Sequence, residues 1–90
     1  MKRILIITNN DIGLYKFRRE LIEKLSQKAE VYLMLPNGQY VDHFLSVGCK
    51  YIPCEFDRHG KNIFDELRLI RAFRETITRV SPDIVLTYTI

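Results

Sequence analysis

The chain has 90 residues, which allows one domain at most. Hydrophobic residues make up 47% of it and charged residues 28%, a balance typical of a globular protein rather than a disordered or membrane-spanning one. The net charge of +3 is mild and acidic residues are interspersed among the basic ones, so we expect no nucleic-acid partner, whereas an anionic ligand or membrane surface fits. The apolar run after Arg3 is too short for an export signal, and we therefore expect a cytoplasmic protein.

Short β-rich runs alternate with helical patterns from the first residues to the last. "RILIIT" is a continuous apolar run, as expected of a strand buried on both faces of a parallel sheet. From Leu14, apolar residues recur at spacings of three and four, which predicts an amphipathic helix with Lys and Arg on its wet side. The apolar residues of this helix are Leu14, Phe17, Leu21, Ile22 and Leu25.

Glycine and proline mark the boundaries of the later elements. Pro36-Asn37-Gly38 is a strong turn signal after the second strand, and Gly48 stands where a helix ends in a residue of positive φ. Pro53 lies within the third strand and predicts a sheet edge, where a missing N–H is tolerated. The expected strands are 3–8, 30–35, 50–56 and 83–90, and the later helices are 40–47 and 63–80, the last with one stripe of Ile63, Leu67, Ile70, Phe73, Ile77 and Val80.

The order β-α-β-α-β-α-β predicts an α/β fold with a parallel, Rossmann-like sheet of strand order 3-2-1-4, because crossover connections are right-handed. The last strand, "IVLTYTI", would then lie beside the first with its other side bare, and such an apolar strand is poorly suited to being an edge. We expect residues 1–90 to be an incomplete half-sheet, either part of a longer protein or a subunit completed by a partner, and self-association through the last strand is a further option.

The loop "NNDIG", residues 9–13, joins the first strand to the first helix. In such a sheet, ligands bind beyond the carboxyl ends of the strands, near the switch between the first and fourth, where this loop would face Thr87, Tyr88 and Thr89. Gly13 allows close approach at the helix N-terminus, where a phosphate is favoured, but the loop is neither a dinucleotide fingerprint nor a Walker motif. Asp11 is a candidate helix cap and would repel a phosphate. The residues alone favour a structural turn over a phosphate site.

The residues point to no catalytic group and no metal site. His43 follows Asp42 on the second helix and is expected at the surface. His59 could act in acid–base chemistry, but a lone loop histidine is a weak signal. The sequence shows no nucleophile–base pair and no pair of carboxylates at helical spacing aimed at one point. Cys49 and Cys54 have no further ligand at metal spacing, which predicts buried free thiols rather than zinc ligands or a disulfide. The basic residues of the helices could meet anionic lipid head groups, but interspersed acidic residues favour an ordinary solvated face.

Several loose motifs occur in one order along the whole chain. "YKFR" follows the glycine loop, "LPNGQY" follows the second strand, "DR" follows the third, and "PDIVLTYTI" ends the chain. In this arrangement the sequence resembles the N-terminal domain of bacterial GT-B glycosyltransferases of the retaining, glycogen-synthase-like class, which act on lipid-linked capsule, exopolysaccharide or glycan precursors. In that class a Lys-Pro stretch usually follows the last strand, and it is absent here.

The resemblance implies a division of labour between two Rossmann-like domains. The glycine loop, here Ile12 and Gly13, would approach the donor diphosphate, while the C-terminal donor-binding domain is absent from these residues. The resemblance implies no metal and no cofactor beyond the nucleotide-sugar substrate, and it assigns no catalytic residue to this half. The implied acceptor side comprises Asn10, Asp11, Tyr15, Asp57, Arg58, Thr87, Tyr88 and Thr89.

The function so implied is that of the acceptor-side part of a hexosyltransferase in cell-surface polysaccharide or lipid-linked glycan synthesis. Its partners would be a nucleotide sugar and a polyprenyl-linked saccharide, with peripheral contact at the inner face of the plasma membrane, and the 90-residue chain alone would be inactive. Two alternatives stay open: a non-catalytic subunit completing a two-chain glycosyltransferase, and a small flavodoxin-like binding module without enzyme activity.

Overall fold

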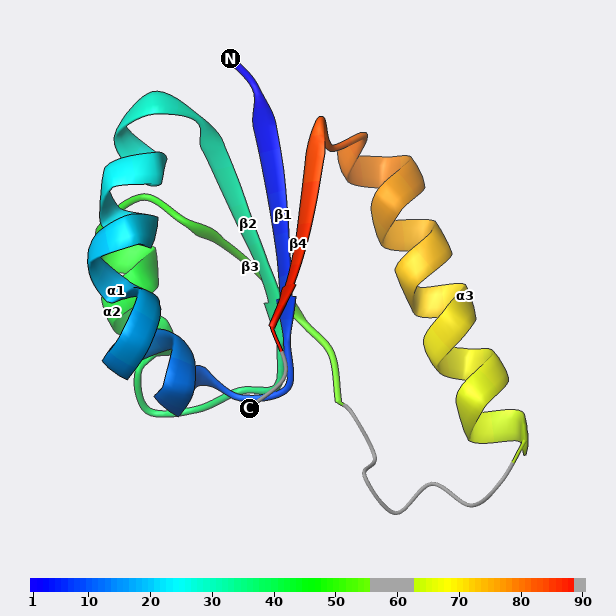
Figure 1. The fold of residues 1–90 in the computed structure, drawn as a ribbon. Coiled ribbons are helices and arrows are strands. Elements are labelled where there is room, and N and C mark those ends of the chain that lie inside the picture. The colour runs from blue at the N-terminus through cyan, green and yellow to red at the C-terminus, as the bar shows by residue number, and fades with distance from the viewer. Residues whose placement is uncertain (56–62, 89–90) are drawn as a thin grey trace.

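In a computed structural model, which describes residues 1–55 and 63–88, seven elements alternate between strand and helix (Figure 1). The four strands form one parallel sheet in the order β3-β2-β1-β4, which confirms the predicted Rossmann-like α/β fold. The elements are β1 (Arg3–Thr8), α1 (Asp11–Lys28), β2 (Glu30–Leu35), α2 (Val41–Ser46), β3 (Lys50–Pro53), α3 (Ile63–Val80) and β4 (Ile84–Tyr88).

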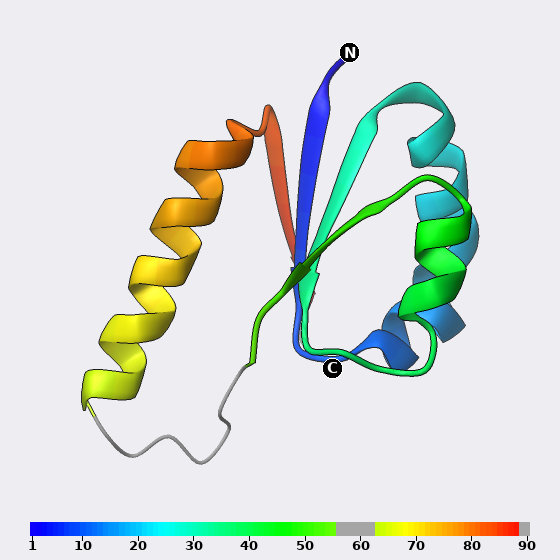
Figure 2. The same ribbon diagram turned by 180° about the vertical axis from the view of Figure 1, so that it is seen from behind.

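The sheet separates two layers of helix. α1 and α2 cover one face and α3 lies against the other, as Figures 1 and 2 show from opposite sides. Alternate residues of β1 divide between the two cores: Ile4 and Ile6 face α1 and α2, whereas Leu5 faces α3. β1 is therefore buried on both faces, as its unbroken apolar sequence requires.

Proline and glycine lie where the sequence predicted them. Pro53 is the last residue of β3, which forms one edge of the sheet, and β4 forms the other edge beside β1. Gly48 follows α2 with φ +102°, a conformation that a residue with a side chain rarely adopts.

The first helix starts earlier than its apolar pattern suggests, at Asp11 rather than Leu14. Asn10 is the N-cap, and its side-chain oxygen accepts a hydrogen bond from the backbone N–H of Gly13. The expectation that Asp11 caps the helix is therefore wrong. Periodicity did not locate this start because the first turn carries polar and small residues.

The predicted apolar stripes of the two long helices are only partly buried. On α1, Leu14 and Ile22 are fully buried, but the Phe17 side chain is 73% exposed and Leu21 is also exposed. On α3, the sheet-facing residues are Leu69, Ala72, Phe73, Thr76 and Val80, while Leu67, Ile70 and Ile77 of the predicted stripe face solvent.

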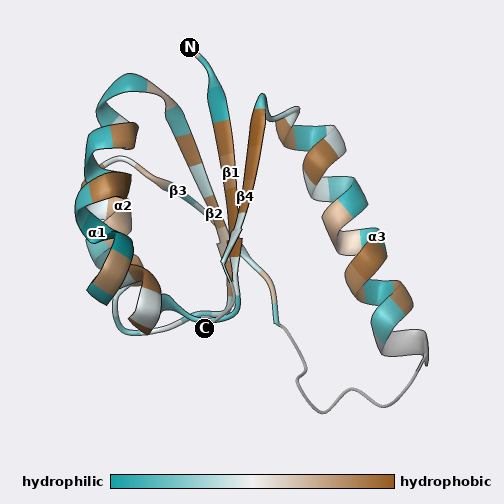
Figure 3. Ribbon diagram, viewed as in Figure 1, coloured by the Kyte–Doolittle hydropathy of each residue, from teal (hydrophilic) through white to brown (hydrophobic). Residues whose placement is uncertain are grey.

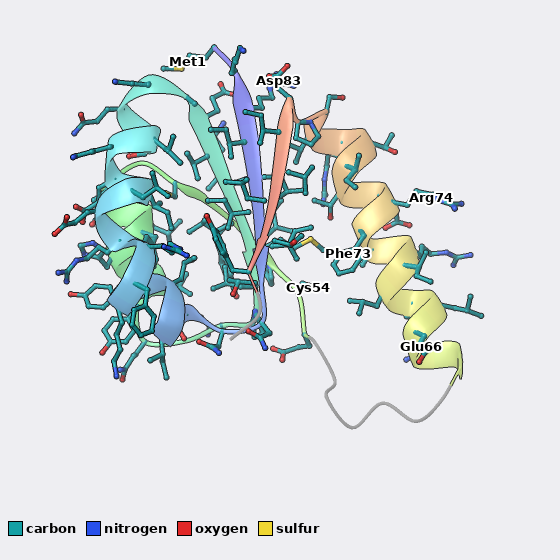
Figure 4. All side chains as sticks on the ribbon, in the orientation of Figure 1. Met1, Cys54, Glu66, Phe73, Arg74 and Asp83 are labelled. Atoms are coloured by element: carbon teal, nitrogen blue, oxygen red, sulfur yellow. The ribbon has the colours of Figure 1, made fainter. Side chains whose placement is uncertain are left out.

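Side chains on α3 show this division directly (Figure 4). Phe73 points from the helix toward Cys54 at the end of β3, and both belong to the core between α3 and the sheet. Arg74 points away from the sheet. Within the described ranges, no helix is long and apolar enough to cross a membrane.

Candidate functional site

The carboxyl ends of β1 and β4 lie side by side. Thr8, the last residue of β1, is in register with Tyr88, the last residue of β4. The loop of Asn9 and Asn10 leaves the sheet at this point and leads into α1. This is the switch point, because the strand after β1 in sequence lies on one side of it and β4 lies on the other.

Local hydrogen bonds order the entry to α1. The Gly13 N–H donates to Asn10 Oδ1 at 3.0 Å, and the Asn10 side-chain amide lies 3.5 Å from Asn9 Oδ1. The buried Thr8 hydroxyl donates to the Asn10 carbonyl oxygen at 3.4 Å. Since the Gly13 N–H already donates to Asn10, it is not a free donor for a phosphate.

Asp11 is buried and joins two loops of the site. Its side chain is 5% exposed, and Oδ2 accepts a hydrogen bond of 2.7 Å from the backbone N–H of Tyr40, at the start of α2. Gly38 lies directly against the carboxylate, where a Cβ atom would overlap both oxygens. The carboxylate therefore holds the loop after β2 against the first turn of α1, and Gly38 gives it the space to do so.

Three tyrosines and two arginines line this end of the molecule. The rings of Tyr15 and Tyr40 are stacked, with centroids 4.0 Å apart and planes 9° from parallel. The Arg19 guanidinium carbon lies 4.5 Å above the Tyr15 ring, and that of Arg18 lies 5.1 Å from the Tyr88 ring. Arg18 therefore links α1 to the end of β4, across the switch point.

A histidine extends this aromatic group to α2. The His43 ring meets Tyr15 edge-on at 5.2 Å, and its Nε2 lies 2.7 Å from Glu23 Oε1. The sequence predicts only a surface position for His43, whereas the structure pairs it with a carboxylate from α1. The spacing of Tyr15 and Arg19, four residues apart on one helix face, was a signal for part of this cluster. Nothing local indicated that Tyr40 and His43 would join it.

The Tyr51 hydroxyl is buried beneath α2 and makes no hydrogen bond to any described residue. Burial raises the pKa of this phenol, and the negative charges of Glu55 and Asp11 raise it further, as does Cys54. The hydroxyl is therefore neutral at physiological pH, and its proton can be donated to a water or ligand that reaches it.

Both cysteines are buried free thiols, as predicted. Burial raises the pKa of the Cys49 thiol to about 11, and the charge of Glu23 contributes. An unfolded thiol ionises near 9.0, so between about pH 9 and 11 the unfolded state loses a proton that the folded state keeps, and stability falls as pH rises.

We therefore expect the wild type to lose more stability between about pH 8 and 10.5 than a Cys49→Ala variant does. Urea denaturation at both pH values measures the loss of stability in each protein. The difference between the two losses reports Cys49, because the lysines and tyrosines common to both proteins contribute equally. An equal loss of stability in both proteins would contradict the raised pKa of the Cys49 thiol. The same raised pKa predicts that alkylation of Cys49 in the folded protein accelerates well above pH 9.

The structure brings together the sequence-predicted residues that it describes. The loop and first turns of α1 carry Asn10, Asp11, Ile12, Gly13 and Tyr15, and Thr87 and Tyr88 end β4 beside them. Ile12 and Thr87 are exposed. Asp57, Arg58, His59 and Thr89 lie outside the described residues, and within the described part no group of three or more His, Cys, Asp and Glu could hold a metal ion.

Comparison with known proteins adds nothing to this geometry. No protein-family model matches the sequence, no curated protein matches it, and no solved structure matches the fold.

Proposed function

We propose that this chain is the acceptor-side, Rossmann-like part of a nucleotide-sugar-dependent glycosyltransferase, with the donor-binding domain supplied by other residues. The observation that supports the proposal most directly is the position of the "NNDIG" loop, at the switch point of a 3-2-1-4 parallel sheet and beside Tyr88. The order of motifs along the chain supports the same class.

The proposed acceptor site is the surface around Tyr15, Tyr40 and Tyr88, where Arg18 and Arg19 lie over aromatic rings. Guanidinium groups suit the hydroxyls of a sugar or an attached phosphate, and the rings of Tyr88 and Tyr15 lie beneath these two guanidinium groups. Asn10 lies at the same edge but its side-chain oxygen is already engaged by Gly13. The acceptor in this proposal is a polyprenyl-diphosphate-linked saccharide at the inner face of the cytoplasmic membrane.

Asp11 takes a positioning role in this proposal rather than a contact with the acceptor. Its carboxylate is buried and bonded to the Tyr40 N–H, so it fixes Tyr40 for stacking on Tyr15. The donor diphosphate would approach the backbone of Ile12 and Gly13, at the positive end of the α1 dipole. Gly13 contributes clearance, because its N–H is engaged by Asn10.

The reaction would be glycosyl transfer with retention, in which this half binds and orients the acceptor and the helix dipole favours the departing diphosphate. A non-catalytic subunit of a two-chain glycosyltransferase is the second candidate. The exposed apolar edge at β4 favours it, since that edge offers a surface to another chain.

Titration of the complete gene product with UDP- and GDP-sugars tests the proposed class. We expect isothermal titration to show saturable binding of one nucleotide sugar by the complete product, and none by residues 1–90 alone. A complete product that binds no UDP- or GDP-sugar would contradict the proposal.

The acceptor side can be tested on the 90-residue chain itself. An amide-resolved NMR titration with a short-chain polyprenyl-diphosphate saccharide should shift the signals of Tyr15, Arg18 and Tyr88, and a Tyr88→Ala variant should weaken binding. Shifts confined to α3 would place the acceptor elsewhere and overturn the site.

A further inference from the structure

The short helix α2 depends on its neighbours for its structure. Its 6 residues are far fewer than the roughly 12–15 that a helix needs to persist alone in water. Its N-cap is Tyr40, whose side chain makes no capping hydrogen bond. The position of α2 is therefore set by what it packs against rather than by its own helix stability.

A glycine lies near each end of α2. Gly38 precedes the helix, in the loop after β2, and Gly48 follows it with φ +102°. Because glycine crosses between backbone regions that other residues avoid, both positions can absorb the change in φ and ψ that a rotation of α2 requires. Segment 38–48 is thus bounded by two candidate hinges.

Side chains from one face of α1 hold this segment against the rest of the molecule. Tyr15 stacks on Tyr40, and Glu23 Oε1 lies 2.7 Å from His43 Nε2. Tyr15 and Glu23 are eight residues apart, so they lie on the same face of α1. Figure 2 shows α2, in green, beside α1, and Figure 3 shows hydrophobic and hydrophilic residues mixed along both helices. We call Tyr15, Glu23, Tyr40 and His43 the latch.

The closed segment covers a polar group that it leaves without a partner. The Tyr51 hydroxyl packs against the core that includes Val41 and Phe44, and it makes no hydrogen bond to any described residue. A buried hydroxyl without a partner costs stability, and this cost falls on the closed form alone, because water reaches the hydroxyl once α2 moves away. Burial of Val41 and Phe44 opposes opening, so the open form is a minor state.

We propose that segment 38–48 is a gate, which opens as a unit about Gly38 and Gly48 and exposes the Tyr51 hydroxyl as a hydrogen-bond donor. The latch opposes opening, and the unpaired hydroxyl favours it. The gate lies beside β3, at the opposite edge of the sheet from β4. The inference does not rest on the proposed glycosyltransferase function.

The two cysteines distinguish this opening from global unfolding. Cys49 directly follows Gly48 and is buried in the same core as Phe44, whereas Cys54 lies in the core on the α3 side of the sheet. A thiol reagent modifies a buried cysteine only when the structure around it opens. Opening of the gate exposes Cys49 and leaves Cys54 buried, while global unfolding exposes both.

Amide hydrogen exchange of the 90-residue chain tests whether the gate opens as a unit. The amides of 43, 44 and 47–49 donate to carbonyl groups within the segment. We expect them to share one opening equilibrium constant, at least about tenfold larger than that of β1 and β2 and nearly independent of low urea, because a local opening exposes little surface.

Removal of the Tyr51 hydroxyl tests the force that favours opening. Tyr51→Phe keeps the ring and relieves the closed form of an unpaired donor, so labelling of Cys49 by a thiol reagent at one fixed pH should slow at least about fivefold. Tyr32→Phe makes the same change on the α3 side of the sheet, where the hydroxyl lies 3.5 Å from Lys50 Nζ. This control should leave the Cys49 rate within about twofold.

Variants of the latch should change the rate in the opposite direction. His43→Gln removes the pairing between the helices, and Tyr40→Leu removes the stacking. We expect Cys49 labelling to accelerate about threefold in the first and about tenfold in the second, with Cys54 labelling within about twofold of wild type. Leu45→Gln changes an exposed residue of α2 outside the latch and should leave both rates within about twofold. Mass spectrometry of the two cysteine peptides measures both rates in one sample.

Three outcomes would overturn the proposal. Amides of 43–49 that exchange only together with β1 and β2 would show that α2 opens only when the whole chain unfolds. A Cys49 rate that is unchanged or raised in Tyr51→Phe would show that the buried hydroxyl does not favour opening. Equal acceleration of Cys49 and Cys54 in the latch variants would make the latch contacts ordinary contributions to global stability. Nucleotide-sugar binding by the complete gene product has no bearing on any of these outcomes.

Discussion

Replacing Gly38 by alanine is expected to destabilise the protein by about 1–3 kcal/mol, because the new methyl group has no space. A Cβ atom at this position overlaps both oxygens of the buried Asp11 carboxylate. Relief requires the carboxylate to leave the Tyr40 N–H, or the loop after β2 to move away from α1. Either change loses a charge-assisted hydrogen bond in a buried site.

The source of this loss can be isolated with a double-mutant cycle. Asp11→Ala alone should cost about 1–3 kcal/mol, since it leaves the Tyr40 N–H without its acceptor. In that background Gly38→Ala should cost close to nothing, because the methyl group enters the space the carboxylate has vacated. Urea denaturation of the four proteins gives the coupling energy, which we expect to exceed about 1 kcal/mol.

Gly48 supplies the matched control. A Cβ atom there meets nothing within 4 Å, but φ is +102°, so Gly48→Ala is disfavoured by backbone conformation alone. It should cost about 1–2 kcal/mol whether residue 11 is Asp or Ala. If Gly38→Ala were equally costly in both backgrounds, the contact with Asp11 would not be its cause.

This Asp11–Gly38 contact marks the limit of what the sequence predicts here. Strand order, the edge position of Pro53 and the positive φ of Gly48 followed from local patterns, because each depends on a residue's own backbone or on chain connectivity. Asp11 and Gly38 are distant in sequence, and the residues around each of them do not indicate that the two are in contact. Asp11 was therefore interpreted as a cap, a role that Asn10 fills.

The apolar stripes show a second limit, of a different physical kind. Periodicity identifies which residues share a helix face, but it does not tell which partner that face meets. On α3, Phe73 and Val80 face the sheet, while Ile70 and Ile77 are exposed. The bare last strand was expected from the sequence, whereas the apolar flanks beside it emerged only when the helices were placed on the sheet.

At the candidate site the sequence located the loop and the strand end but not the aromatic cluster. The switch-point rule placed residues 9–13 beside Tyr88, as the register of β1 and β4 confirms. The stacking of Tyr15 on Tyr40 depends on how α2 packs against α1. The position of Tyr40 follows from the hydrogen bond between its backbone N–H and Asp11. The sequence alone did not reveal how Asp11 packs against the loop after β2.

Substitution of Gly13 by valine in the complete gene product is expected to reduce sugar transfer about 100-fold, the scale of loss that a displacement of 1 Å produces. Gly13 lies in the first turn of α1, beside the end of β4, and in the proposed function the donor diphosphate passes close to its backbone. The added isopropyl group would hold the diphosphate away from the helix N-terminus. Valine has a better helix propensity than glycine, so propensity does not oppose folding.

The measurement that separates a lost contact from a lost fold is steady-state transfer combined with thermal unfolding of the same variant. Lys16→Val, which places the same side chain at an exposed position of the next helical turn, should retain transfer within about twofold, as surface substitutions usually do. Unchanged turnover in Gly13→Val would remove the diphosphate from this loop and leave Gly13 as the third residue of a capped helix. A loss of transfer without loss of the thermal transition would instead support the loop as one wall of the active site.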